Sequence, residues 1–377
     1  MGNLAGIYTN QGKRNEAEQL EVQVLDMSKK LFGMEHPDTL ICMGNLAGTY
    51  LWQGKWNEAE QLEVQVLEMR KKLLGVEHPH TILSMGNLVR IYNKQGKWNE
   101  AEQLGVQALD MRKKLLGAEH PDTIISMENL ASTYSSQGKW NKAEQLKVQV
   151  LDFRMKLFGA DHPDTLTCMG NLARTYADKG NFKEAEQLEI QVLDMSKKLL
   201  GAKHPNTLVS MGNLAGIYSS QGKWNEAEQL RVQVLDSRMK LFGANHPDTL
   251  ICMGNLARTY ADKGNSKEAE QLEVQVLDMS KKLLGAEHPN TLLSMGNLAS
   301  TYSNQGKWSE AEQLEVQVME MRKKVLGAEH PYILLSMGNL ARIYTNQGKW
   351  IEAEQLEFQM MDMIERVFGK EYPNMRI

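Results

Sequence analysis

Met43-Gly-Asn-Leu-Ala-Gly-Thr-Tyr50, followed by Gln53-Gly-Lys-Trp-Asn-Glu-Ala-Glu-Gln-Leu62, decides the fold because it belongs to a 42-residue cassette that occurs nine times in the chain. A unit this short cannot bury its apolar face alone and becomes stable only when it stacks on its neighbours. The sequence therefore predicts a single solenoid domain over residues 1–377. Its repeats cover residues 1–42, 43–84, 85–126, 127–168, 169–210, 211–252, 253–294, 295–336 and 337–377.

Each cassette is expected to form a helix-turn-helix, as repeat 2 illustrates. Pro37 opens the first helix, which should run to about Trp52. The second helix should begin at Asn57, whose side chain caps it, and should end at Gly75 in the left-handed conformation. Apolar residues at intervals of three and four form the expected core, namely Leu40, Met43, Leu46, Ala47 and Tyr50 in the first helix and Ala59, Leu62, Val66, Met69 and Leu73 in the second.

Composition excludes several classes of function. The net charge of -4 and the pI near 6.2 give no basic surface for nucleic acid. The sequence contains neither an apolar run long enough for a membrane span nor a secretory signal, so we expect a cytoplasmic protein with no membrane partner. Three cysteines lie at one cassette position, at least two repeats apart, which places them too far from one another for disulfides: Cys42, Cys168 and Cys252.

The ends of the array lack the polar capping repeats that solenoids need. The chain starts inside a first helix and stops near Tyr372-Pro373, where another first helix should begin. This pattern predicts either a piece of a longer array or an end that a partner buries, and a second copy of the chain, through self-association of the uncapped ends, is one such partner.

Asn-Leu-Ala-x-x-Tyr followed by Gly-Lys-Trp-x-Glu-Ala-Glu-x-Leu resembles the tetratricopeptide repeat over the whole chain. The 42-residue length and the Gly-x-x-His-Pro-Asp-Thr turn are similar to the kinesin-light-chain subclass, which also forms arms of fungal NLR-like regulators. The resemblance implies an all-α, right-handed superhelical solenoid whose concave groove binds a peptide segment of a partner. One position departs from the family pattern, because a charged residue or glycine replaces the usual bulky residue four positions after the helix-B alanine. The residue at this position must therefore pack differently from its family counterpart or face solvent. The position holds Glu21, Glu63, Gly105, Lys147, Glu189, Arg231, Glu273, Glu315 and Glu357.

The asparagine of Met-Gly-Asn-Leu is the first candidate for the groove. In the family the matching position faces the groove and bonds the backbone of a bound peptide, and an amide can donate two and accept two hydrogen bonds. The alternative, that these amides pair with neighbouring helices, stays open. The candidates are Asn45, Asn87, Asn129, Asn171, Asn213, Asn255, Asn297 and Asn339, with Asn3 in the first repeat.

Two neighbouring positions add to this candidate groove. The residue before each asparagine is a glycine, except in repeat 4, where it is Glu128. A glutamate would not fit against another helix, which indicates that the position is open. Three residues after the asparagine lie arginines that would form a basic stripe for acidic peptides, unless they are solvated residues inherited by duplication: Arg90, Arg174, Arg258 and Arg342.

The aromatic residues and histidines of the cassette have mostly structural interpretations. The Gly-Lys-Trp tryptophans are expected to pack between helices, whereas Trp52, which occurs only in repeat 2, is a candidate anchor for a ligand. The histidines before the turn prolines are spaced one repeat apart and cannot share a zinc ion. They are His36, His78, His120, His162, His204, His246, His288 and His330.

No P-loop is present, and no set of unlike catalytic groups stands apart from the repeats. The sequence therefore predicts a non-enzymatic scaffold without metal or cofactor, whose partner is a protein or peptide, with an acidic ligand favoured if the arginine stripe lines the groove. Two alternatives stay open: the sensor arm of a larger NLR-like regulator, and a cargo adaptor of the kinesin-light-chain type.

Overall fold

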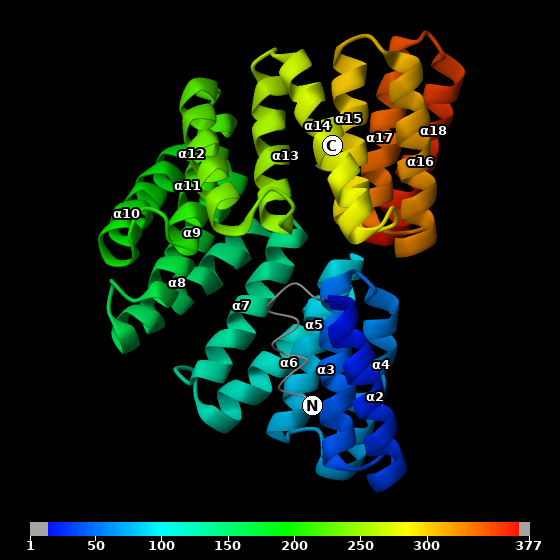
Figure 1. Cartoon of the computed structure of the whole chain (residues 1–377). Helices are drawn as coiled ribbons and strands as arrows, with labels where there is room; N and C mark the ends of the chain where they lie inside the picture. Colours follow the sequence, from blue (N-terminus) through cyan, green and yellow to red (C-terminus); the bar gives the residue numbers. More distant parts are fainter. Residues whose placement is uncertain (1–13, 369–377) are drawn as a thin grey trace. The chain divides into compact units, whose positions relative to one another are not determined.

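The structure is a computed structural model that describes residues 14–368, which form seventeen α-helices and no strand (Figure 1). The helices fall into two compact units, Met1–Gly159 and Ala160–Ile377. The first contains α2 (Arg14–Phe32), α3 (Pro37–Gln53), α4 (Trp56–Leu74), α5 (Pro79–Gln95), α6 (Trp98–Leu116), α7 (Pro121–Ser136) and α8 (Trp140–Phe158). The second contains α9 (Pro163–Asp178), α10 (Phe182–Leu200), α11 (Pro205–Ser220), α12 (Trp224–Phe242), α13 (Pro247–Asp262), α14 (Ser266–Leu284), α15 (Pro289–Asn304), α16 (Trp308–Leu326), α17 (Pro331–Asn346) and α18 (Trp350–Phe368).

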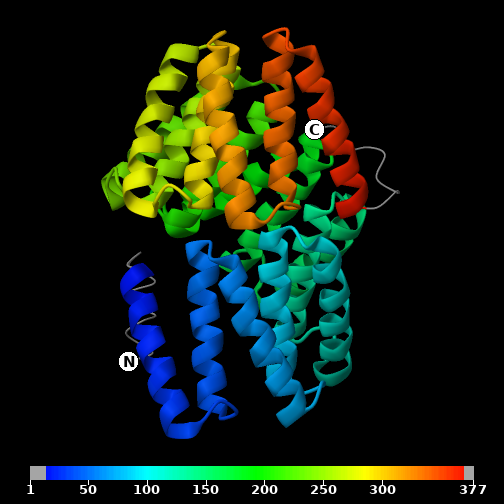
Figure 2. The ribbon, with the colours of Figure 1, turned by 90° about the vertical axis from the view of Figure 1, so that its right-hand side faces the viewer.

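Within each unit, every helix packs against the helices that precede and follow it (Figures 1 and 2). The odd-numbered helices from α3 are the first helices of the cassettes, and the even-numbered ones are the second helices. First helices of successive repeats also contact each other, as α5 with α7 and α9 with α11 do. This stacking confirms the all-α fold of repeated helix-turn-helix pairs. A single solenoid over residues 1–377 stays a prediction.

The ends of the helices follow the turn chemistry of the cassette, with two corrections. His36 is the N-cap of α3, and its Nδ1 accepts a hydrogen bond from the backbone N–H of Asp38 at 3.2 Å. The predicted cap at Asn57 is wrong, because α4 begins one residue earlier, at Trp56, and has no side-chain cap. Gly75 ends α4 with φ 91° and ψ 164°, a positive φ but not the left-handed helical conformation expected. That conformation occurs instead at Gly54, with φ 78° and ψ 9°.

The predicted core of repeat 2 is largely confirmed. Leu40, Met43 and Leu46 of α3 form one buried cluster with Val66 of α4 and Leu25 of α2. Burying each such side chain contributes roughly 1.5–3 kcal/mol relative to leaving it exposed. Leu73, also expected in the core, is wrong, since it lies in the last turn of α4 and is 44% exposed.

A polar contact between repeats explains the lysine of Gly-Lys-Trp. Lys97 Nζ lies 2.6 Å from Glu60 of the preceding repeat, and Gln95 Nε2 donates to the same carboxylate at 2.7 Å. The lysine–glutamate contact recurs with Lys55–Glu18, Lys139–Glu102, Lys223–Glu186, Lys307–Glu270 and Lys349–Glu312. In repeat 7 it is Lys263, at the position of Gln95, that contacts the glutamate of the preceding repeat, Glu228. Over residues 14–368, none of the helices combines the length and apolarity that crossing a membrane would require.

Candidate functional site

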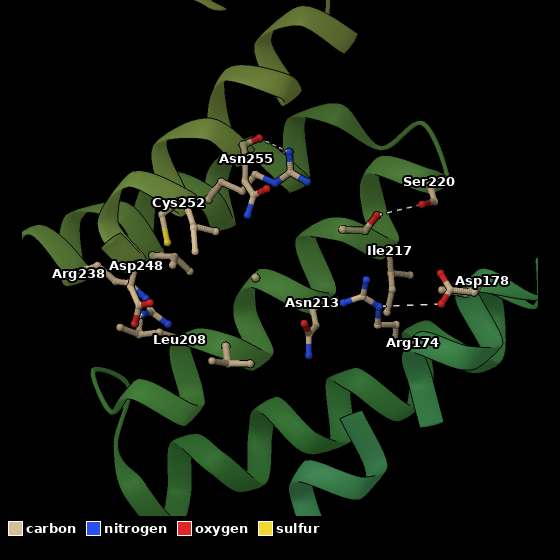
Figure 3. Close-up of a pocket in the computed structure, with 17 residues that line it drawn as sticks. Arg174, Asp178, Leu208, Asn213, Ile217, Ser220, Arg238, Asp248, Cys252 and Asn255 are labelled. Carbon is tan, nitrogen blue, oxygen red and sulfur yellow. Dashed lines mark hydrogen bonds and ion pairs between the residues drawn. The ribbon is translucent and has the colours of Figure 1, made fainter. Parts of the chain in front are cut away.

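One face of the first helices lines a hollow of about 520 Å³ in the second unit, between α9, α11 and α13 (Figure 3). We call it the central hollow. Asn213 of α11, Asn255 of α13 and Arg174 of α9 line it. The structure therefore brings three predicted groove residues together. The other predicted residues of this unit, Asn171, Arg258, Asn297, Arg342 and Asn339, lie on the same kind of helix outside this hollow.

An apolar row that the sequence analysis did not identify runs beside the asparagines. Val209 lies one helical turn before Asn213, is 50% exposed and lines the central hollow, as does Ile251. Residues four apart share one face of a helix, so the row follows the asparagine row through the repeats. The signal in the sequence is an apolar residue two positions before the cassette methionine, interrupted once by Thr167. The row is Ile41, Leu83, Ile125, Val209, Ile251, Leu293 and Leu335, each between 41% and 51% exposed.

Glycines in the first helices leave room beside these rows. A Cβ atom added at Gly212 or Gly254 would meet no heavy atom within 4 Å. At Gly170 it would lie 3.5 Å from the carboxylate of Glu189. In repeat 4 the same position holds Glu128, which pairs with Arg154 of α8 at 2.9 Å. The glycine position is therefore open in repeats 6 and 7 and lies over buried polar groups in repeat 5.

Glu357 in α18 is exposed, but four of the other glutamates that replace the family's bulky residue are buried rather than solvent-facing. Their exposed fractions are 1% for Glu63, 0% for Glu189, 4% for Glu273 and 0% for Glu315. Burial raises the pKa of all four carboxyls, and it raises the pKa of Glu273 to about 7. At least one oxygen of each carboxylate has no hydrogen-bond partner among the described residues.

Hydrogen bonds link these glutamates to the first helix of the next repeat. Ser210 Oγ donates to Glu189 Oε1 at 2.6 Å, and Asn213 Nδ2 approaches the same oxygen at 3.5 Å. Asn87 Nδ2 donates to Glu63 Oε1 at 3.2 Å. For Asn87 and Asn213, pairing with a neighbouring helix therefore uses one of the two amide donors. The side chain keeps a second donor and an acceptor for other contacts.

The four predicted arginines are exposed on their first helices. Arg174 has a side chain 76% exposed, and its Nε lies 4.0 Å from Asp178 Oδ2 on the same helix (Figure 3). Arg342 Nη2 donates to Ser300 Oγ of the preceding repeat at 3.3 Å. An exposed ion pair such as that of Arg174 contributes about 0–1 kcal/mol, so it leaves the guanidinium able to engage another anion.

Arg231 gives the central hollow a cation at the position where repeats 2, 5, 7 and 8 bury a glutamate. Its guanidinium donates to the backbone carbonyl of Asn255 and to Thr259 Oγ1 of α13. Burial lowers its pKa to about 10, so it remains a cation at neutral pH. Arg238 also lines the hollow and pairs with Asp248 at 2.6 Å. This hollow therefore has positive charge where four other interfaces carry a carboxyl group.

The remaining candidates lie in the first unit or are structural. Asn45, Asn87, Asn129, Arg90 and Trp52 are on α3, α5 and α7, and Trp52 is 58% exposed, which fits an anchor for a ligand. Asn3 lies outside the described residues.

The tryptophans of Gly-Lys-Trp differ among themselves. Trp56 is buried, as predicted, whereas Trp350 at the start of α18 is 66% exposed. The packing interpretation is therefore wrong for Trp350, and it holds only in part for Trp308, which is 39% exposed. The position that Trp56 occupies is covered by the end of the next first helix, because Gln95 Nε2 bonds its carbonyl oxygen at 3.3 Å.

The turn histidines act as helix caps, which the sequence analysis did not identify, and each accepts a backbone hydrogen bond. Within residues 14–368, no cluster of three or more His, Cys, Asp or Glu side chains could hold a metal ion.

Comparison with known proteins identifies the family. Tetratricopeptide repeat models match residues 1–72, 45–114, 80–156, 190–238 and 216–282 in one form, and residues 165–206, 291–332 and 333–374 in another. These matches cover most of the sequence, so the chain belongs to the tetratricopeptide repeat family. None of the curated proteins compared with it matches.

Solved structures agree with this assignment. A crystal structure of a Podosopora anserina putative kinesin light chain with nearly identical TPR-like repeats has 36% identity, with 55% of this chain and 98% of that chain covered and a TM-score of 0.46. The identity confirms that the repeats are of the kinesin-light-chain-like kind. The apo quorum sensor NprR from B. thuringiensis (14% identity, 96% and 97% covered, TM-score 0.59) shares the fold alone. The same is true of a Rap protein in complex with Competence and Sporulation Factor (12% identity, 88% and 99% covered, TM-score 0.52).

Proposed function

We propose that the protein is a protein-interaction scaffold whose central hollow, with the adjoining faces of the first helices, binds an extended segment of a partner protein. The observation that carries this proposal is the convergence of Arg174, Asn213, Asn255 and Val209 on one hollow of about 520 Å³. Asparagine amides suit the backbone of an extended chain, and the apolar row suits alternate side chains of that chain.

Charge supports an acidic segment as the ligand at this place. Arg174 is exposed at the rim, and Arg231 stands where other repeats bury a glutamate. Guanidinium groups bind carboxylates in two-point geometry, which gives orientation as well as attraction. The open positions at Gly212 and Gly254 support close approach of a ligand backbone beside these cations.

We propose no catalysis for this chain. Catalysis needs unlike groups that converge on one point, whereas most groups of the groove recur along a line. The regulatory-arm and cargo-adaptor alternatives both use the same groove for recognition, so one experiment bears on all three roles.

The experiment is selection of peptides from a random display library on the purified protein, followed by measurement of Kd by fluorescence anisotropy. Val209→Glu and Gly212→Leu should weaken the selected peptides at least tenfold. Leu199→Glu is the matched control, because Leu199 is 49% exposed at the end of α10 and does not line the hollow. If the selected peptides bind both groove variants with the same Kd as the wild type, the proposal is refuted.

A further inference from the structure

A second, smaller hollow lies where repeat 5 lacks an arginine that other repeats have. One position of the second helix holds Arg70, Arg112, Arg154, Arg238 and Arg322, but Ser28, Ser196 and Ser280 in repeats 1, 5 and 7. At Ser196 the structure has a hollow of about 160 Å³, which we call the Ser196 hollow.

The arginine of the other repeats shows what such a space accommodates. Arg70 Nη1 donates to Ser84 Oγ at 2.8 Å and to the carbonyl oxygen of His80 at 3.0 Å, both on the next first helix. Arg322 repeats the arrangement with Ser336 Oγ at 2.7 Å and the carbonyl oxygen of Tyr332 at 3.0 Å. In these repeats a buried guanidinium therefore bridges a second helix and the first helix that follows.

A buried glutamate completes the arrangement. Glu63 lies seven residues before Arg70 on the same helix face, and the positive charge of Arg70 lowers the pKa that burial raises. Ser84 hydrogen-bonds both Arg70 and Glu63. The serine thus connects the guanidinium to the carboxylate.

Repeat 5 retains each of these acceptors without the arginine. Glu189, Ser210 and Asn206 correspond to Glu63, Ser84 and His80, and all three line the Ser196 hollow. Ser210 still donates to Glu189 Oε1. Glu189 is 0% exposed, and its Oε2 has no hydrogen-bond partner among the described residues.

We propose that the Ser196 hollow binds a guanidinium group from outside the chain, the side chain of an arginine in a bound partner segment, at the place where Arg70 and Arg322 put their own. A guanidinium has five N–H donors and no acceptor, which fits a hollow lined by Glu189, Ser210 and Asn206, because the counterparts of Asn206, His80 and Tyr332, accept from the arginine through their carbonyl oxygens. A cavity of about 150 Å³ holds benzene, so a planar group of four heavy atoms fits this volume.

The position of the Ser196 hollow connects it to the proposed groove. Val209 and Asn213 line both hollows, and Val209 and Thr167 at the rim are exposed. The claim that the guanidinium belongs to an arginine next to the acidic part of the ligand rests on the proposed function. The claim that the hollow binds a guanidinium does not depend on it.

Repeat 7 is a natural comparison, because it also has a serine, Ser280, in place of the arginine. There Ser294 Oγ donates to the carbonyl oxygen of Asn290 at 3.0 Å, whereas Ser210 Oγ of repeat 5 donates to the buried glutamate. Glu273 is linked to Thr301 rather than to that serine. The acceptor set of repeat 5 is therefore not reproduced in repeat 7.

The test is titration of the full chain with millimolar methylguanidinium, followed by ligand-observed NMR, with methylammonium as the reference cation. Methylguanidinium should bind saturably and at least tenfold more tightly than methylammonium. Ser196→Arg should abolish this binding, because the chain then supplies its own guanidinium, while the matched variant Ser280→Arg should leave it unchanged.

Three results would overturn the proposal: no saturable binding, equal binding of the two cations, or binding that Ser196→Arg leaves unchanged. Arg322→Ser adds a gain-of-function test, since it should create a second methylguanidinium site. If these tests fail while peptides still bind in the central hollow, the guanidinium site is refuted and the proposed function stands. Methylguanidinium binding without any selected peptide would support the guanidinium site and refute the proposed function.

Discussion

Replacing Glu273 by glutamine should stabilise the protein at alkaline pH and leave its stability unchanged in acid. Glu273 is 4% exposed, and its pKa rises from 4.5 to about 7, first because of burial and then because of repulsion from Glu270, against a hydrogen bond from Thr301. The native state therefore keeps a proton that the unfolded chain loses between these two values. Stability falls as pH rises from 4.5 to about 7 and is constant above that range for this group.

The magnitude follows from the size of this difference. A change in carboxyl pKa from 4.5 to about 7 corresponds to roughly 3 kcal/mol in the free energy of unfolding. Glutamine has nearly the same shape and no charge, so Glu273→Gln should remove up to this amount of destabilisation at pH 8. The other buried glutamates contribute to the pH dependence of both proteins and cancel in the comparison.

The assay is urea unfolding followed by circular dichroism from pH 4.5 to 8.5 for both proteins. Glu357→Gln is the matched control, since Glu357 holds the same cassette position in α18 and is exposed. The difference between Glu273→Gln and wild type should grow with pH, and the control should show no such growth. A difference that stays constant with pH, or that shrinks as pH rises, would refute the assignment of Glu273 as a buried neutral acid.

Three further predictions concern the groove and the turns. Gly212→Leu should abolish peptide binding yet keep or raise the thermal midpoint of unfolding. A Cβ atom added there meets no heavy atom within 4 Å, and glycine costs a helix up to about 1 kcal/mol. Unfolding of this variant would show that the position is packed. Arg174→Glu combined with Arg258→Glu should weaken an acidic peptide about tenfold in anisotropy titrations at low salt, whereas Lys197→Glu combined with Lys198→Glu, the same change in net charge at exposed positions of α10, should not; equal losses would indicate a general charge effect. His120→Ala should lower the free energy of unfolding by about 1 kcal/mol through loss of the α7 cap, and a neutral effect in urea unfolding would contradict the capping role.

Most of the fold could be predicted from the sequence because each boundary carries its own local signal. Pro37 begins α3 as expected, and the break at Gly54 follows from a glycine with φ 78°. The cap at Asn57 could not be decided locally, since an asparagine suits both the N-cap and the first turn, and the helix begins one residue earlier. The exposed Leu73 shows that apolar periodicity alone overestimates how far a core extends.

The candidate site was predictable only in part, because its key contacts cross between repeats. Asn213 and Arg174 were identified from a repeated position, whereas Glu189 was noted only as a departure from the family pattern and not as a site residue, since a charged residue on a helix normally lies in water. Its partner Ser210 lies 21 residues away, and no spacing rule within one helix connects them. The exchange of Arg70 for Ser196 is visible in the aligned repeats, but its consequence requires the hollow that the structure describes.

The most direct test of the account is photo-crosslinking of a selected peptide to the protein from two positions. A benzophenone amino acid placed at Val209, in the central hollow, should crosslink to the peptide, and the adduct should disappear with excess unlabelled peptide. The same amino acid at Leu199, equally exposed but outside the hollow, should give no specific adduct. Specific crosslinks from position 199 and none from position 209 would contradict the claim that this groove binds the partner.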